Sequence, residues 1–277
     1  MYISELFLHE KGLARTDLIA IVSHVLSLSK EQVLMEPGRR LGREDWDRIQ
    51  DLVRQRKEGK PVAYLTRQRE FFSESFYVDE RVLIPRPETE SLVEEALAII
   101  GGLGRPARVL DMGTGSGVIG ILLARGGAEI AFCADISFDA IVVARRNAIA
   151  MGVEGKTVFV ASDLFSSIKK EAVFDVICAN LPYVGLDEWE ALMVDVRCHE
   201  PAQALLGGLM GAELYGRFVV EATSYLRPGG AVLCEIGSKG QAAMVGALLK
   251  KAGLEVAVKS DLAGRQRVVR GRWTNSS

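Results

Sequence analysis

The spacing of hydrophobic residues divides the chain near residue 70. Before this point, segments 15–28 and 43–59 carry apolar residues three or four positions apart, which predicts two amphipathic helices. Gly59 is expected to end the second helix, and residues 59–65 (GKPVAYL) to form a turn. The apolar positions are Leu18, Ile19, Val22, Val25 and Leu26 in the first helix and Trp46, Ile49, Leu52 and Val53 in the second. The sequence therefore predicts a small helical domain over residues 1–70.

The pattern changes after this domain. Residues 69–90 predict a short β pair that leads into a proline-rich loop, so we expect a connector over residues 71–90. Thr89 is a candidate N-cap for the helix that follows. That helix has an apolar face formed by Leu92, Val93, Ala96 and Leu97.

From Arg108 onward, apolar runs of strand length alternate with helical patterns. This alternation predicts a mostly parallel sheet with helices on both faces. The expected strands are 107–113, 129–137, 156–165, 172–180 and 229–237, and the expected helices are 116–127, 137–152, 211–226 and 239–253. Two last strands, 254–261 and 265–271, are joined too tightly for a helix and predict an antiparallel hairpin. We therefore expect an α/β domain with seven strands over residues 91–277.

Composition and charge narrow the class of protein. Hydrophobic residues make up 48% of 277, enough for a sizeable core, and 25% charged residues argue against a disordered chain. The formal net charge of −2 argues against a main affinity for phosphate backbones. No stable nucleic-acid partner is therefore expected.

Cysteine and histidine spacing favours a metal-free protein of a reducing compartment. The four cysteines form no C-x-x-C pair, and most lie in strand-like runs, so free buried thiols are expected. The three histidines are scattered, so no metal site is predicted. The N-terminus lacks a signal-peptide pattern, and no run of about 18 apolar residues exists. We expect a cytoplasmic location.

A glycine-rich loop, VLDMGTGSGVIG, joins the first strand to its helix. Its glycines allow a sharp turn and close approach to a ligand beyond the carboxyl ends of the strands. Gly115, Gly117 and Gly120 also satisfy G-x-G-x-x-G, which leaves a dinucleotide enzyme open. The candidate cofactor-binding residues here are Gly113, Thr114, Gly115, Ser116 and Gly117.

Carboxylates after the strands extend the candidate cofactor site. Asp135 ends the second strand and can accept both ribose hydroxyls of an adenosine, or it can cap the helix starting at Ser137. Asp163 can lie beside the adenine or be a plain loop residue. Asp111, before the glycines, can hold water or the ammonium of an amino-acid end. This position, together with the terminal hairpin, favours S-adenosylmethionine over a dinucleotide, and the hairpin resembles the seven-stranded Rossmann-like methyltransferase sheet.

The fourth strand ends in Asn180, Leu181, Pro182 and Tyr183, next to the first strand across the switch point. An amide or aromatic-amine nitrogen is a poor nucleophile because its lone pair is delocalised. The Asn180 side-chain oxygen and the Leu181 carbonyl can accept its two N–H hydrogens and direct the lone pair at a methyl group. Pro182 restricts Leu181 to extended geometry, and Tyr183 can lie over the flat group. We expect these four residues to be catalytic and to bind the target, and Asn180 also to contact the cofactor.

The tetrad resembles the (Asn/Asp)-Pro-Pro-Tyr motif of methyltransferases that act on planar amino nitrogens. With VLIPRPETE at 82–90, VLDMGTGSG, EPAQALLGG at 200–208 and DLAGRQRVVRG at 261–271, the chain closely resembles the HemK/PrmC family. Those enzymes methylate the glutamine of the Gly-Gly-Gln motif in peptide-chain release factors. The resemblance implies that Leu164 lines the cofactor site with Asp135 and the glycine loop. It also implies a release-factor substrate, which the helical domain is expected to recognise, and we expect a monomer.

Two residues depart from the family pattern. Leu181 replaces the first proline of the tetrad, which keeps the carbonyl but adds an N–H, and Arg67 stands where the family usually has glycine. Other readings remain open at this point: an adenine-N6 methyltransferase acting on RNA or DNA, a glutamine methyltransferase of a ribosomal protein, and a non-catalytic adenosine-binding module. The near-neutral charge and the IPRPETE segment argue against the adenine-N6 methyltransferase. The intact Asn180, Pro182 and Tyr183 argue against the non-catalytic module.

Overall fold

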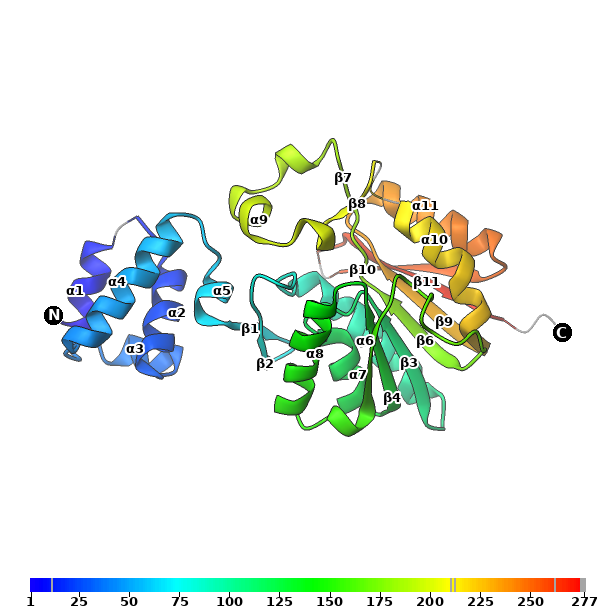
Figure 1. The fold of residues 1–277 in the computed structure, drawn as a ribbon, viewed down its shortest axis with the longest axis horizontal. Helices are drawn as coiled ribbons and strands as arrows, with labels where there is room; N and C mark the ends of the chain where they lie inside the picture. The colour runs from blue at the N-terminus through cyan, green and yellow to red at the C-terminus, as the bar shows by residue number, and fades with distance from the viewer. Residues whose placement is uncertain (11, 210, 212, 262, 275–277) are drawn as a thin grey trace. The chain divides into compact units, whose positions relative to one another are not determined.

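The computed structural model divides into two compact units (Figure 1). The first unit comprises Met1–Gln68 and Met193–His199, and the second comprises Arg69–Leu192 and Glu200–Ser277. The structure describes residues 1–10, 12–209, 211, 213–261 and 263–274. Three segments discussed above contain positions outside the described residues. They are position 212 of the predicted helix 211–226, position 262 of the predicted hairpin and positions 275–277 of the tail.

The first unit is helical, as the apolar spacing predicts. Its helices are α1 (Ile3–His9), α2 (Arg15–Leu26), α3 (Lys30–Met35), α4 (Arg43–Lys57), α5 (Val62–Thr66) and α9 (Val194–His199). The core forms mainly between α2 and α4, where Leu18, Val22, Ile49 and Val53 are buried. The helices α1 and α3 were not predicted. The second of these begins with a reciprocal capping box, because Ser29 Oγ accepts from Gln32 N and Gln32 Oε1 accepts from Ser29 N.

The expected turn over residues 59–65 is wrong, because its second half is the short helix α5. Pro61 has φ −57° and its carbonyl accepts hydrogen bonds from the N–H groups of Tyr64 and Leu65, so the proline starts a helix instead of breaking one. The helix ends at Arg67, which has a left-handed φ of +56°. Glycine, which the family usually has here, adopts this conformation most easily. Arg67 has the same backbone turn and adds a side chain to it.

The second unit begins with the predicted β pair, β1 (Gln68–Phe71) and β2 (Glu74–Tyr77), of which Gln68 belongs to the first unit. A short 3-10 turn, η1 (Pro87–Thr89), then leads into α6 (Glu90–Gly102). Thr89 does not cap α6 with its side chain, so that expectation is wrong. The cause is its helical backbone (φ −64°, ψ −20°), whereas an N-cap needs extended geometry to receive an N–H.

Within the described residues, the central sheet has seven strands in the order β10-β11-β9-β6-β3-β4-β5. The strands β3, β4, β5, β6 and β9 are parallel, and the β10–β11 hairpin pairs antiparallel with β9, as predicted. The strand bounds are β3 (Ala107–Met112), β4 (Ala128–Asp135), β5 (Thr157–Ala161), β6 (Phe174–Ala179), β9 (Leu226–Glu235), β10 (Glu255–Ser260) and β11 (Gln266–Arg272).

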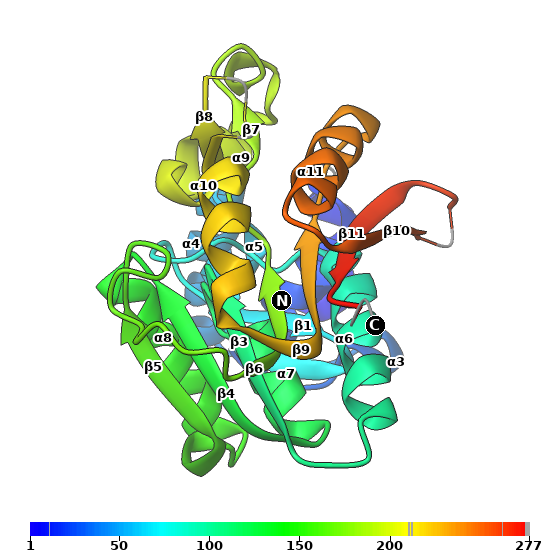
Figure 2. The same ribbon diagram turned by 90° about the vertical axis from the view of Figure 1, so that its right-hand side faces the viewer.

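Helices cover both faces of this sheet, which explains the unbroken apolar runs of the inner strands (Figure 2). One face packs on α6, α7 (Val118–Arg125) and α8 (Phe138–Ala150), and the other on α10 (Glu213–Ala222) and α11 (Lys239–Lys251). Cys133, Cys178 and Cys234 are buried free thiols in the strands, whereas Cys198 is exposed. Among the described helices, none is long and apolar enough to cross a bilayer.

The register of the inner strands decides which side chains meet. Met112 of β3 pairs with Ala179 of β6, and Ala179 also pairs with Cys234 of β9. Asn180 and Glu235 therefore leave neighbouring strands at the same carboxyl edge. The predicted loop-rich stretch that follows Asn180 contains short elements that the sequence did not predict, namely β7 (Val184–Gly185), η3 (Trp189–Ala191), η4 (Ala202–Ala204) and β8 (Leu206–Gly208), in addition to α9.

Candidate functional site

A cavity of about 320 Å³ lies in the second unit, beyond the carboxyl ends of β3, β4 and β6. The structure brings residues from several distant segments of the sequence to its wall. The predicted site residues that line it are Gly113, Thr114, Gly115, Ser116, Asp135, Leu164, Asn180, Leu181 and Pro182. Two other predicted residues, Gly117 and Tyr183, lie outside this lining.

The loop between β3 and α7 turns through backbone angles that favour glycine. Gly115 has φ +54° and Gly117 has φ +87°. A Cβ on Gly115 would meet no atom within 4 Å, whereas a Cβ on Gly117 would lie 2.8 Å from Ile121 Cδ1 and 3.0 Å from Ala144 Cβ. Gly115 therefore leaves room for a ligand, and Gly117 allows α7 to pack closely against α8.

Asp111 lies beneath the glycine loop, not in the cavity. It is fully buried, and its Oδ2 accepts hydrogen bonds from Thr114 Oγ1 at 2.6 Å and from the Gly120 N–H at 2.9 Å. Burial raises its pKa to about 6. In this structure Oδ2 fixes the shape of the loop, whereas Oδ1 has no hydrogen-bond partner among the described residues. The suggestion that Asp111 holds water or a ligand ammonium stays a prediction.

Asp135 lines the cavity, and a backbone N–H group donates a hydrogen bond to each of its carboxylate oxygens. Oδ2 accepts from the Gly115 N–H at 2.9 Å and Oδ1 from the Ser137 N–H at 2.9 Å. Ser137 caps α8 itself, because its Oγ accepts from the Ala140 N–H at 3.2 Å. Each carboxylate oxygen has a second lone pair, so Asp135 retains acceptor capacity for the hydroxyls of a bound ribose.

Residues after β5 form the next part of the wall. Ser162 Oγ donates to the Leu164 carbonyl at 2.6 Å, which holds Leu164 at a left-handed φ of +48°. Leu164 is buried and presents an apolar surface to the cavity. Asp163 also lines the cavity and forms an ion pair with Arg217 at 3.0 Å. Whether Asp163 also lies beside the adenine of a bound cofactor stays a prediction.

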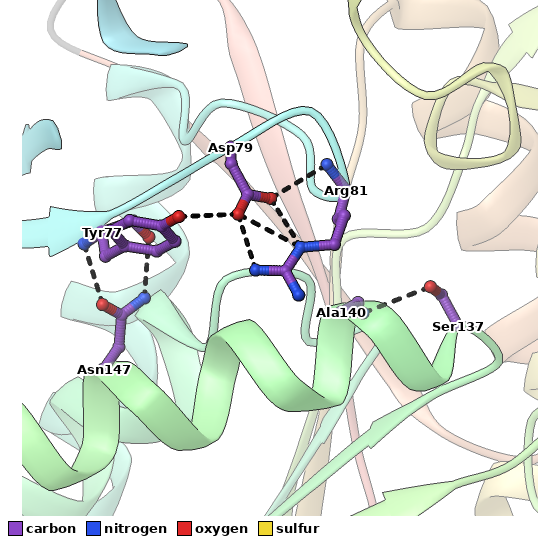
Figure 3. Close-up of polar contacts among 6 residues, drawn as sticks. All are labelled: Tyr77, Asp79, Arg81, Ser137, Ala140 and Asn147. Atoms are coloured by element: carbon purple, nitrogen blue, oxygen red, sulfur yellow. Dashed lines mark hydrogen bonds and ion pairs between the residues drawn. The ribbon is translucent and has the colours of Figure 1, made fainter. Parts of the chain in front are cut away.

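Figure 3 shows how the segment after β2 is held against α8. The Tyr77 backbone exchanges hydrogen bonds of 2.8 and 2.9 Å with the Asn147 side chain. Asp79 accepts from Tyr77 Oη at 2.8 Å and from Arg81 Nη2 at 2.6 Å. Burial raises the pKa of Asp79, but the hydrogen bonds from Arg81 and Tyr77 outweigh it and lower the pKa to about 2. This network brings Arg81 to the cavity wall.

The tetrad follows β6 directly. Leu181 is buried, and its N–H donates to Tyr215 Oη at 3.2 Å, so the donor that proline would lack has a partner. The Tyr183 carbonyl accepts from Gln241 Nε2 at 2.8 Å. The Tyr183 ring packs against Gly237, where a Cβ would lie 2.7 Å from Tyr183 Cε2. Asn180, Leu181 and Pro182 thus line the cavity, and Tyr183 faces the end of β9.

Two of the family-specific segments meet beside the cavity. Arg86, from the proline-rich loop, forms an ion pair of 2.5 Å with Glu200, and the Ile84 N–H donates to the other carboxylate oxygen at 3.0 Å. Glu200 is 5% exposed. Because removal of either partner would leave the other group buried without compensation, these bonds hold the two segments together.

Sequence reasoning missed two polar residues next to the tetrad. Tyr215 is buried, and its hydroxyl donates to the Glu235 carbonyl at 2.5 Å while accepting from Leu181. Glu235 ends β9 with a side chain that is 3% exposed, and burial raises its pKa to about 7. A sequence signal that could have identified Glu235 is the acidic residue at the end of the otherwise apolar strand AVLCE.

The residues present fit S-adenosylmethionine. Asp135 offers acceptors for ribose hydroxyls, and Gly115 leaves open space where a bulky residue would fill the cavity. Ile136, which is 55% exposed, and Leu164 supply apolar surface for a flat ring. The acceptors of the tetrad lie at another part of the same wall.

Comparison with solved structures defines the class. The ribosomal protein L11 methylase from Lactobacillus delbrueckii subsp. bulgaricus superposes with a TM-score of 0.53 at 18% identity, covering 72% of this chain and 84% of that one. The seven-stranded sheet with its terminal hairpin is thus a Rossmann-like methyltransferase fold. The cavity lies beyond the carboxyl ends of the parallel strands, where open α/β sheets bind their ligands.

Comparison with known sequences defines the family. The PrmC N-terminal domain family matches residues 4–66, and the methyltransferase small domain family matches residues 93–206. The release factor glutamine methyltransferase of Chlorobaculum tepidum is 39% identical over 87% of this chain and 84% of its own length. That of Bacillus cereus is 35% identical over 95% of this chain and 94% of its own. The chain belongs to the release factor glutamine methyltransferase family.

Proposed function

We propose that this protein transfers a methyl group from S-adenosylmethionine to the side-chain amide nitrogen of the glutamine in the Gly-Gly-Gln motif of release factors. Family membership supports the reaction and the substrate. The observation that carries the assignment to this site is the position of Asn180, Leu181 and Pro182 on the wall of a cavity that fits the cofactor. The adenine-N6 alternative is not favoured.

The chain's own residues would act by orienting a weak nucleophile. The cofactor supplies an electrophilic methyl group on a positively charged sulfur. Asn180 Oδ1 and the Leu181 carbonyl would each accept one hydrogen of the glutamine NH₂ group, which directs the nitrogen lone pair at the methyl. Pro182 keeps Leu181 extended, so the carbonyl direction is fixed before the substrate arrives.

The helical unit is the proposed recognition element for the release factor. It carries none of the cofactor-loop residues, and the PrmC N-terminal domain family matches most of it. Recognition by a separate unit would let the second unit bind one glutamine side chain while specificity comes from a larger surface. The cytoplasmic location and the monomeric state stay predictions.

Single-turnover methylation of a purified release factor tests the role of the tetrad. Asn180→Ala should lower the rate by about 10²- to 10³-fold, because one positioned acceptor at the reacting nitrogen is lost. Asn180→Asp keeps an accepting oxygen and should retain more activity than the alanine variant. Circular dichroism and thermal unfolding check that each variant is folded. A normal rate for Asn180→Ala would show that this residue only shapes a turn.

A further inference from the structure

Arg81 combines a fixed orientation with unused hydrogen-bond donors. Its Nε donates to Asp79 Oδ1 at 2.9 Å and its Nη2 donates to Asp79 Oδ2 at 2.6 Å, a side-on pairing that fixes the plane of the guanidinium. Figure 3 shows the third nitrogen, Nη1, directed away from Asp79. Nη1 makes no hydrogen bond to another residue that the structure describes, and the Arg81 side chain is 37% exposed. Its donors therefore remain available to a ligand.

The segment that carries Arg81 is anchored to the glycine loop. Asn147 of α8 is 2% exposed, and its Nδ2 donates to the Tyr77 carbonyl at 2.9 Å and to the Ser116 carbonyl at 2.8 Å. Because Ser116 belongs to the glycine loop, one buried amide joins this loop to the segment after β2. Figure 3 shows that segment passing over α8 from Asn147 toward the end of the helix at which Ser137 lies. Arg81 is thus held in place relative to the glycine loop.

Arg81 lines the same cavity as Asp135, Ser137 and Ala140. A carboxylate can only accept hydrogen bonds, whereas each ribose hydroxyl has one hydrogen and two lone pairs. A hydroxyl that donates its hydrogen to Asp135 therefore needs a donor for its own oxygen once water is excluded. The N–H groups of Gly115 and Ser137 are already engaged, because both donate to Asp135 itself. Arg81 Nη1 is a donor at this wall that is not engaged.

We propose that Arg81 is a further cofactor-binding residue, whose Nη1 donates to the ribose hydroxyl oxygens of S-adenosylmethionine while Asp135 accepts the hydroxyl hydrogens. The inference rests on the proposed function only through its cofactor, and not on which protein is methylated. Arg81 would bind the cofactor without touching the methyl group or the target nitrogen. Its loss should therefore appear in cofactor affinity.

The pairing with Asp79 determines what kind of interaction Arg81 offers. S-adenosylmethionine carries a positive charge on its sulfur, so an unpaired cation in the same cavity would be unfavourable. The Asp79 carboxylate, whose side chain is 6% exposed, offsets the charge of the guanidinium and leaves directed N–H donors. Lysine has a single nitrogen, so it cannot pair with Asp79 and also present a second nitrogen to the ribose. The proposal therefore requires a guanidinium and not merely a positive charge.

Calorimetric titration of the full-length protein with S-adenosylhomocysteine tests the proposal. Arg81→Ala should lower the affinity by about 10- to 100-fold, the loss expected for hydrogen bonds from a charged donor. Arg81→Lys should lose a similar factor, and it keeps a partner for Asp79 if the alanine variant fails to fold. Arg145→Ala is the matched control, because Arg145 lies on α8 outside the cavity lining and pairs with Glu154 at 3.0 Å. It should bind as the native protein does.

Two analogues locate the contact. 5′-Methylthioadenosine keeps the ribose and lacks the amino-acid end, so Arg81→Ala should weaken its binding by the same factor. An S-adenosylhomocysteine analogue without ribose hydroxyls should bind equally well to the native protein and to Arg81→Ala, because the acceptors for Nη1 are absent. A purely structural role of Arg81 would instead weaken the binding of all three ligands alike.

Several results would overturn the proposal. Native affinity of Arg81→Ala for S-adenosylhomocysteine would exclude the contact, and native affinity of Arg81→Lys would show that charge alone suffices. A loss that persists with the analogue lacking hydroxyls would assign Arg81 to packing. A loss that disappears with 5′-methylthioadenosine would assign it to the carboxylate of the amino-acid end. A native protein that binds S-adenosylhomocysteine and leaves the release factor unmethylated would refute the proposed function, and the role of Arg81 would stand.

Discussion

Leu181 shows how a single residue can depart from a motif and keep its chemistry. Proline at this position would lack a backbone N–H, and leucine adds one in a buried place. A buried donor without a partner is costly, but the Leu181 N–H donates to Tyr215 Oη. The tyrosine hydroxyl in turn donates to the Glu235 carbonyl. The departure is therefore accommodated by a residue more than thirty positions away.

A double-mutant cycle tests this pairing. Leu181→Pro should retain activity, because the carbonyl that accepts the substrate hydrogen is preserved. Tyr215→Phe should lower the free energy of unfolding by about 1–3 kcal/mol, because the Leu181 N–H loses its acceptor. In the Leu181→Pro background this loss should shrink, since the N–H is absent. Urea unfolding of the four proteins measures the coupling, and fully additive effects would contradict it.

Glu235 should make stability depend on pH. Burial raises its pKa from the ordinary 4.5 to about 7, so the folded protein keeps a proton that the unfolded chain has already released. Its contribution to the free energy of unfolding is fully present below pH 4.5 and is lost as the pH rises through about 7. Glu235→Gln removes this loss, so relative to native it should gain about 3 kcal/mol between pH 4.5 and about pH 8.

Urea unfolding of both proteins across this pH range is the measurement. The two stability curves should diverge as the pH rises, with Glu235→Gln the more stable at the alkaline end. Parallel curves would show that Glu235 ionises in the folded protein as it does in the unfolded chain.

At the scale of elements, the sequence predicted what long apolar patterns determine. The strands of the central sheet are buried on both faces, so they appear as continuous apolar runs, and the order of elements then limits the topology. Short elements were not predicted because a few residues show no hydrophobic periodicity. The SKEQ capping box of α3 was a local signal, whereas β7 and β8 pair with each other across a loop and leave no periodicity.

The site was predictable only where a motif lies in one segment. The glycine loop, Asp135 and the tetrad fall at strand ends, and the structure places most of these residues on one cavity wall. The partners of the tetrad were not predictable, because Thr89 meets Asn180, and Tyr215 meets Leu181, only through tertiary packing. The prediction of Thr89 as a helix cap fails because its sequence context is typical of a cap, whereas its backbone conformation is helical.

The C-terminal end of α5 offers a test of backbone strain. Arg67 has a left-handed φ of +56°, which disfavours any residue with a Cβ by about 1 kcal/mol relative to glycine. Arg67→Gly should therefore be more stable than Arg67→Ala by about that amount. The alanine variant is the matched control, because both substitutions remove the guanidinium and only one keeps the Cβ. Equal unfolding midpoints would show that the turn is unstrained.

At the scale of the whole molecule, the chain separates into a helical unit and a unit that contains the entire cavity. This division predicts that the two activities can be separated. A protein lacking residues 1–68 should bind S-adenosylhomocysteine with native affinity, measured by calorimetry, and should fail to methylate an intact release factor. A short peptide containing Gly-Gly-Gln should be methylated equally slowly by both proteins. A soluble truncated protein that modifies the release factor at the native rate would refute the recognition role.

The most direct test of the central claim is to map the methyl group. The full-length protein would be incubated with isotopically labelled S-adenosylmethionine and a purified release factor, and the product digested and sequenced by mass spectrometry. The claim predicts one added methyl group on the side-chain amide nitrogen of the Gly-Gly-Gln glutamine, and none when that glutamine is replaced. A parallel incubation with ribosomes and with RNA covers the other amino-nitrogen substrates. Label on RNA or on a ribosomal protein, with the release-factor glutamine unmodified, would contradict the claim.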